Sequence, residues 1–100
     1  MAVIVHVVLA DVTRDQYDAV RASCGWLTDH PTGGLAHLTW WNGNDCHNVD
    51  AWESEAAFGD FAEGRLAPAM AAAAVEVEPK TTFFAAHEVF LPEARTDTAT

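Results

Sequence analysis

Lysine and arginine are scarce in this sequence. Among its 100 residues, five basic side chains face fifteen aspartates and glutamates, which gives a formal net charge of −10. Proteins bind nucleic-acid phosphates and anionic membrane surfaces through clustered basic side chains. The charge balance therefore argues against nucleic acid and against an anionic membrane as partners.

Cysteines and long apolar runs are also few. The two cysteines, Cys24 and Cys46, form no CxxC pair, and neither an HExxH motif nor a glycine-rich phosphate loop occurs. The apolar run AVIVHVVL at 2–9 is too short to span a bilayer and lacks the basic leader and cleavage site of a signal peptide. We therefore expect a cytoplasmic protein without a structural disulfide.

The order of the sequence patterns predicts one α+β domain over residues 1–91. Two helical patterns separate four β-branched or alternating segments, which are predicted strands over 2–9, 35–41, 46–53 and 82–91. The order β-α-β-β-α-β predicts a ferredoxin-like fold, with a four-stranded antiparallel sheet and the first strand between the third and the fourth. Residues 92–100 are polar and are predicted to form a disordered tail.

Both helical patterns begin with a capping signal. Thr13 and Gln16 form a capping box, and Gly25 is expected to end the first helix. Ser54 is the predicted cap of the second helix, and Pro68 is expected to start a further short helical segment. The predicted buried stripes are Tyr17, Val20 and Cys24 on the first helix, and Phe58, Phe61, Ala62 and Leu66 on the second.

Two helices can cover only one face of such a sheet. The first strand lacks the polar alternation of a strand with one solvated face, so its other face is expected to be buried too. A small domain gains stability by burying a face against a copy of itself. We therefore expect a homodimer.

Chemically versatile side chains gather in one predicted hairpin, HLTWWNGNDCHNVDAWES at 37–54. Strand side chains alternate between faces, so an even-numbered loop around Asn42-Gly43 joins odd positions before it to even positions after it. The face so defined carries Leu35, His37, Thr39, Trp41, Cys46, Asn48, Asp50 and Trp52. A four-residue loop would set His37 opposite Asp50, and a two-residue loop would set it opposite Asn48.

This face of the hairpin suggests acid–base chemistry on a small molecule. A carboxylate or an amide beside an imidazole can hold one tautomer of its ring, and indoles can wall a pocket for an aromatic ligand. We therefore predict that the catalytic residues are His37 and Asp50, and that the substrate-binding residues are Trp41, Asn48, Trp52, His6 and His87.

A structural interpretation stands beside the catalytic one. His37 and Asp50 would then be a hydrogen-bonded pair at a solvated sheet edge, with His6 and His87 satisfied within the fold. A metal held by His37, Asp50 and a third side chain is a further alternative, although the spacing of a known zinc motif is missing. We expect no bound metal and no tightly bound cofactor.

The stretch VDAWESEAAFGDF resembles the dimeric α+β barrel proteins, and above all their antibiotic-biosynthesis-monooxygenase-like branch. The segments GGLAH at 33–37 and AHEVF at 86–90 fit the same pattern, and the resemblance covers residues 2–91. The residues that carry it are Trp52, Glu53, Ser54, Glu55, Ala57, Phe58 and Phe61. It implies a homodimer in which two sheets pack face to face, with a ligand pocket between the sheet and the helices of each subunit.

The resemblance implies several activities. Members include cofactor-free oxygenases of aromatic polyketides, polyketide cyclases, lactone isomerases and haem-degrading enzymes, and a shared fold does not choose among them. The haem-degrading members use a histidine on the second helix as iron ligand, and the segment ESEAAFGDFAEGRL contains none, although Trp52 matches their tryptophan. We expect a cofactor-independent monooxygenase, cyclase or isomerase of specialised metabolism; the alternatives are a non-catalytic dimeric ligand-binding or accessory protein and a haem-binding member.

Overall fold

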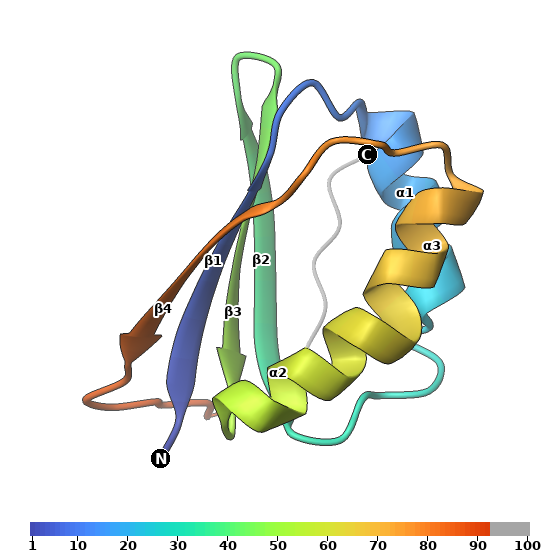
Figure 1. Ribbon diagram of the computed structural model, residues 1–100. Coiled ribbons are helices and arrows are strands. Elements are labelled where there is room, and N and C mark those ends of the chain that lie inside the picture. The colour runs from blue at the N-terminus through green and yellow to red at the C-terminus, as the bar shows by residue number, and fades with distance from the viewer. Residues whose placement is uncertain (93–100) are drawn as a thin grey trace.

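The computed structural model describes residues 1–92, and its elements follow the predicted order. They are β1 (Val3–Leu9), α1 (Arg14–Cys24), β2 (Gly34–Asn42), β3 (Asp45–Trp52), α2 (Glu55–Phe61), the π-helical turn η1 (Ala62–Leu66), α3 (Ala67–Ala72) and β4 (Lys80–Ala85). The strands form one antiparallel sheet in the order β2-β3-β1-β4, and the helices lie together on one side of it (Figure 1). The predicted ferredoxin-like α+β fold is confirmed, whereas the predicted tail lies, apart from Pro92, outside the described residues.

Helix α1 begins and ends at the predicted signals. The Thr13 side chain accepts a hydrogen bond from the backbone of Gln16, whose own side chain accepts one from the backbone of Thr13. Gly25 ends the helix with a φ of 68°, a left-handed conformation in which glycine has no Cβ penalty. The helix buries Val20 and Cys24 against the sheet and leaves Tyr17 half-buried beside β2.

The second helical layer runs through three consecutive segments. Ser54 caps α2 by accepting a hydrogen bond from the backbone of Ala57, as predicted. The chain then widens into η1, where the backbone N–H of Ala67 bonds to the carbonyl of Ala62, five residues earlier. Pro68 follows in the first turn of α3 and has no N–H to continue the normal helical pattern, which gives the wider turn a physical reason.

Strand β4 is shorter than the sequence indicated. The strand predicted over 82–91 is observed as Lys80–Ala85, and residues 86–91 lie outside the sheet. Within the described part of the chain, strand β4 pairs with β1 alone, and the first residue of β1, Val3, is opposite Ala85. After one further bond, from the N–H of Ala86 to the carbonyl of Ala2, the segment has no neighbouring strand among residues 1–92 with which to pair.

The hairpin register matches one of the two predicted alternatives. His37 lies opposite Asp50, as expected for the four-residue loop, but the ladder gains one more pair, Asn42 with Asp45, and the turn itself is Gly43-Asn44. Gly43 has a φ of 63°, the positive value that the first turn residue needs in a tight hairpin. At the other end the register shifts between Gly34 and Ala36, so Leu35 occupies a bulge and does not continue the alternating face.

The two faces of the sheet are unequally covered. On β1, the alternate residues Val5, Val7 and Leu9 are buried beneath the helices. The intervening residues are only half-buried, and their face exposes large apolar side chains, namely Leu38, Trp40 and Phe84. We call this second face the open face. No helix within the described residues has the length and apolar character needed to cross a bilayer.

Candidate active site

The centre of the site is a histidine–carboxylate pair on the helix-covered face of the hairpin. His37 on β2 and Asp50 on β3 are directly opposite each other, and His37 Nδ1 lies 2.6 Å from Asp50 Oδ1. The side chain of Asp50 is 7% exposed and that of His37 is 26% exposed. Because a carboxylate can only accept, Nδ1 carries the proton in this arrangement and Nε2 of the neutral ring is the acceptor.

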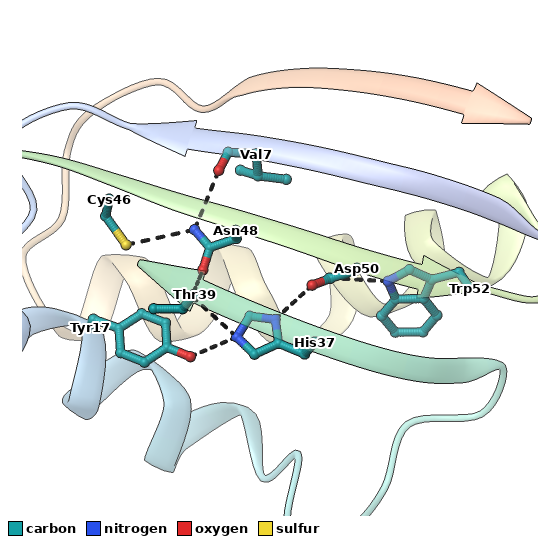
Figure 2. A network of polar contacts seen from close by, with 8 residues as sticks. All are labelled: Val7, Tyr17, His37, Thr39, Cys46, Asn48, Asp50 and Trp52. Carbon is teal, nitrogen blue, oxygen red and sulfur yellow. Dashed lines mark hydrogen bonds and ion pairs between the residues drawn. The ribbon is translucent and has the colours of Figure 1, made fainter. Parts of the chain in front are cut away.

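The acceptor nitrogen of His37 meets a tyrosine from the helical layer. The hydroxyl of Tyr17 on α1 lies 2.6 Å from His37 Nε2, and the two rings are nearly parallel, at 3°. The phenol thus donates to the imidazole, which donates to the carboxylate (Figure 2). The resulting chain, Tyr17–His37–Asp50, has the logic of a catalytic triad, in which a hydroxyl is activated by a histidine that a carboxylate orients.

The buried carboxylate is held from both sides. Trp52, which is fully buried, donates its indole N–H to Asp50 Oδ2 at 3.1 Å, while His37 occupies Oδ1. Asp50 is 5% exposed, and its only ion-pair partner among residues 1–92 is His37. These two bonds fix the orientation of the carboxylate, and through it the orientation of the His37 ring.

A second set of bonds fixes the neighbouring hydroxyl. Thr39 lies 3.4 Å from His37 Nε2, but its hydroxyl donates to Asn48 Oδ1. The Asn48 amide nitrogen in turn donates to the carbonyl of Val7 at 3.3 Å and lies 3.7 Å from Cys46 Sγ. Asn48 thus ties β2 to β1 (Figure 2). Because the Thr39 proton is directed to Asn48, Tyr17 is the group that donates to His37.

Burial changes the acidity of the phenol. It raises the pKa of Tyr17 above its ordinary value, and this effect outweighs the Thr39 hydroxyl and the Arg21 charge, which lower the pKa. Burial likewise raises the pKa of the Cys46 thiol nearby. Tyr17 is thus a neutral phenol at ordinary pH, with its proton directed at His37.

Aromatic rings surround the chain of polar groups. Trp41 contacts the Tyr17 ring edge-on and donates its N–H to the carbonyl of Val12 at 2.7 Å, so it holds α1 against the sheet. Trp26, which follows the end of α1, has its ring centroid 5.5 Å from that of His37 and 5.8 Å from that of Phe61. Trp26 therefore closes the site on the side of α2.

The structure brings together most, but not all, of the predicted site residues. His37, Asp50, Asn48, Trp41 and Trp52 belong to one network or its packing shell, as the hairpin pattern indicated.

His6 and His87 do not join this network. His6 lies on the open face, where its Nε2 is 3.1 Å from His47 Nδ1 and its ring is stacked near Trp40. His87 is exposed and follows the end of β4, because the sheet stops at Ala85. The structure thus places both histidines away from His37.

Sequence reasoning missed Tyr17 and Trp26 as members of the site. Tyr17 was assigned to a buried helical stripe, and a signal was available there, because a buried phenol needs a hydrogen-bond partner whereas a phenylalanine does not. Trp26 follows the helix-ending Gly25 in a loop, where no periodic pattern indicates the direction of a side chain.

The cluster is not a ready-made metal site. Among residues 1–92, no three histidine, cysteine, aspartate or glutamate side chains are grouped so as to hold a metal ion. A half-open hollow of about 490 Å³ lies beside the network rather than at His37, and Pro31, Ala57, Phe61 and Arg65 are among its lining residues. Phe61 also contacts Trp26 and Trp52, so these rings separate the hollow from the polar chain.

Comparison with solved structures supports the architecture. A protein of unknown function from Nitrosomonas europaea is 21% identical, with a TM-score of 0.68 over 93% of this chain and 96% of its own. SnoaB, a cofactor-independent oxygenase from Streptomyces nogalater, is 19% identical, with a TM-score of 0.62 over 92% and 97%. A candidate antibiotic biosynthesis monooxygenase from Deinococcus radiodurans is 16% identical, with a TM-score of 0.57 over 94% and 100%.

These likenesses are structural. No protein-family model matches the sequence, and no curated protein matches it either. At such identities, shared architecture establishes the fold and leaves the activity to the site. The chain therefore shares its ferredoxin-like α+β fold with these solved structures, among them a cofactor-independent oxygenase and a candidate antibiotic biosynthesis monooxygenase.

Proposed function

We propose that this protein is an enzyme that removes a proton from a small aromatic or polyketide-like molecule without a cofactor. The observation that carries the proposal is the hydrogen-bonded chain of Tyr17, His37 and Asp50. A histidine held in one tautomer by a buried carboxylate is a general base with a ready acceptor for the proton. The fold shared with a cofactor-independent oxygenase supports the same class of chemistry.

The aromatic substrate class follows from the walls of the site. The Trp26 ring lies next to His37 and packs against Trp52 and Phe61, and planar apolar molecules pack well against such aromatic surfaces. The half-open hollow beside Phe61 provides a place for part of a ligand, and Phe61 contacts Trp26, which in turn contacts His37.

Proton removal serves either of two outcomes. In a monooxygenase, the electron-rich substrate anion reduces molecular oxygen directly, so that one oxygen atom enters the product and the other leaves as water. In a cyclase or an isomerase, the same anion closes a ring or shifts a bond, and no oxygen is consumed.

Substitution of His37 and Asp50 tests the proposal. We use 9-anthrone in air as the probe, because its methylene group is acidified by two aromatic rings and a carbonyl, and its oxidation gives anthraquinone and water. We expect His37→Ala to lose roughly 10²–10⁴-fold in turnover, the usual contribution of a general acid–base group. Asp50→Asn should lose less, because it keeps the shape and one hydrogen bond but not the charge.

Thermal stability measured on the same preparations separates the two interpretations of His37. A structural histidine would lower the melting temperature of His37→Ala and leave turnover per folded molecule unchanged, and that result would refute the catalytic assignment. Proton exchange at the anthrone methylene group without oxygen uptake would favour the cyclase or isomerase over the monooxygenase. A wild-type protein that binds the probe and leaves it unchanged would favour a ligand-binding or accessory protein.

We also propose that the protein works as a homodimer through the open face. The support is chemical: strands β2 and β4 contribute the large apolar side chains of Leu38, Trp40 and Phe84, which are 60%, 43% and 53% exposed in the single chain. An apolar sheet face in a small protein is normally covered by a second layer. Two copies packed through this face would each keep their own site, which lies on the opposite face.

A further inference from the structure

We propose that Tyr17, rather than His37, is the residue that exchanges a proton with the substrate, and that His37 acts through it. This inference rests on the proposed proton abstraction and changes the identity of the reacting atom. The phenol oxygen of Tyr17 becomes the contact point, and His37 and Asp50 become positioning residues behind it.

The first support is that neither nitrogen of His37 is free. Nδ1 is bonded to Asp50 and Nε2 to the Tyr17 hydroxyl, both at 2.6 Å. For a substrate to reach Nε2 directly, the phenol would have to leave, and its ring is fixed by the edge-on contact with Trp41. The imidazole is thus enclosed by protein groups at both of its reactive atoms.

The second support is the capacity left on the phenol. A tyrosine hydroxyl that donates its proton to His37 still has lone pairs that can accept one. Thr39, the other hydroxyl near Nε2, does not compete, because its proton is directed to Asn48. Tyr17 is half-buried, and its oxygen is the terminal group of the hydrogen-bonded chain that runs through His37 to Asp50.

The transfer balances without any further reactant. The Tyr17 O–H bond breaks and its proton forms a bond with His37 Nε2. The substrate C–H or O–H bond breaks, its proton goes to Tyr17 Oη, and the bonding electron pair stays on the substrate. The products are a substrate anion, a neutral phenol and an imidazolium, whose charge the buried Asp50 carboxylate stabilises without becoming protonated.

The test follows proton removal itself under argon. Purified full-length protein is mixed with 9-anthrone in D₂O, and the loss of its methylene proton signal is followed by NMR against buffer alone. Because no oxygen is present, the signal reports the first step for a monooxygenase, a cyclase or an isomerase. The variants are Tyr17→Phe, His37→Gln and the double variant, with His47→Gln on the open face as the matched histidine control.

We expect the wild-type protein and His47→Gln to accelerate exchange equally. Tyr17→Phe and His37→Gln should each be slower by roughly 10²–10⁴-fold, and the double variant no slower than either, because residues that act as a unit are not additive. Melting temperature is measured for every variant. A Tyr17→Phe protein that is as stable as wild type but inactive excludes a merely structural role.

Other outcomes overturn the inference in distinguishable ways. If Tyr17→Phe exchanges as fast as wild type or faster while His37→Gln is slow, His37 meets the substrate itself, and the proposed function survives without this inference. If Tyr17→Phe is slow while His37→Gln keeps the wild-type rate, the two do not form a relay. If the wild-type protein does not exceed buffer, the proposed proton abstraction fails, and the inference fails with it.

Discussion

Tyr17 is the only tyrosine in the chain, so its ionisation can be followed by absorbance without interference from another phenol. Its pKa is raised, chiefly by burial, so the folded protein keeps the phenol proton at a pH where the unfolded chain has lost it. Between the two pKa values the unfolded state binds fewer protons, and stability must therefore fall as pH rises. The fall begins near the unfolded pKa of about 10 and continues through the folded value.

This linkage gives a prediction at the scale of one residue. Tyrosinate absorbance in the folded protein should appear at a higher pH than in the same protein unfolded in urea. The free energy of unfolding should decrease above about pH 10, and Tyr17→Phe should remove much of that decrease. A decrease that begins at lower pH, near the ordinary thiol pKa of 9.0, should remain from Cys24 and Cys46, because burial also raises the pKa of each thiol. Coincident titrations of the folded and unfolded protein would contradict the buried position of the phenol.

At the scale of the elements, a glycine marks where β2 meets α2. Gly33 has a φ of 83°, and a Cβ built on it would lie 2.7 Å from Cβ of Ala57 on α2. Its carbonyl also accepts a hydrogen bond from the N–H of Glu53 at 2.8 Å. Arg65 of η1 holds the loop that carries Trp26, because it donates hydrogen bonds to the carbonyls of Cys24 and Asp29. These contacts set the distance between the helical layer and His37.

The corresponding prediction compares two glycines. Gly33→Ala should destabilise the protein by about 2–4 kcal/mol, because it combines a left-handed backbone with an overpacked contact. Gly59→Ala, in the interior of α2 with open space where its Cβ would lie, should stabilise by about 0.5–1 kcal/mol. Urea unfolding measures both. Equal effects of the two substitutions would mean that the junction has no special geometry.

At the scale of the whole molecule, the proposed homodimer can be tested at the open face. Leu38 on this face and Leu27 in the loop after α1 are 60% and 59% exposed. The two leucines are equally accessible, so Leu27 serves as a matched control that lies outside the open face. We expect light scattering to give twice the chain mass for the wild type and for Leu27→Asp. Leu38→Asp should weaken the dimer by about 10²-fold or more, since two unpaired charges would be buried around the symmetry axis. A wild-type monomer at micromolar concentration would contradict the proposed homodimer.

The order of elements could be predicted from the sequence because its signals are local. The capping box at Thr13, the cap at Ser54 and the left-handed Gly25 act within a few residues, and the structure uses all three. The alternation of strand side chains likewise placed His37, Asp50 and Asn48 on one face before the register was known, since that parity does not depend on the loop length. The sequence by itself determined the fold and the hairpin half of the candidate site.

What remained was decided by contacts between distant segments. The end of β4 depends on where β1 begins, because β1 is its partner. The register of the hairpin depends on one additional residue pair at its turn. His6 faces away from His37 because the pairing of β1 with β3 sets which β1 side chains point to each face of the sheet. The Tyr17 hydroxyl reaches His37 across 20 residues, from a helix whose periodicity shows only that one side is buried. Periodicity identifies the side of an element that meets the core, whereas the partner of each polar atom is fixed only when the two layers pack.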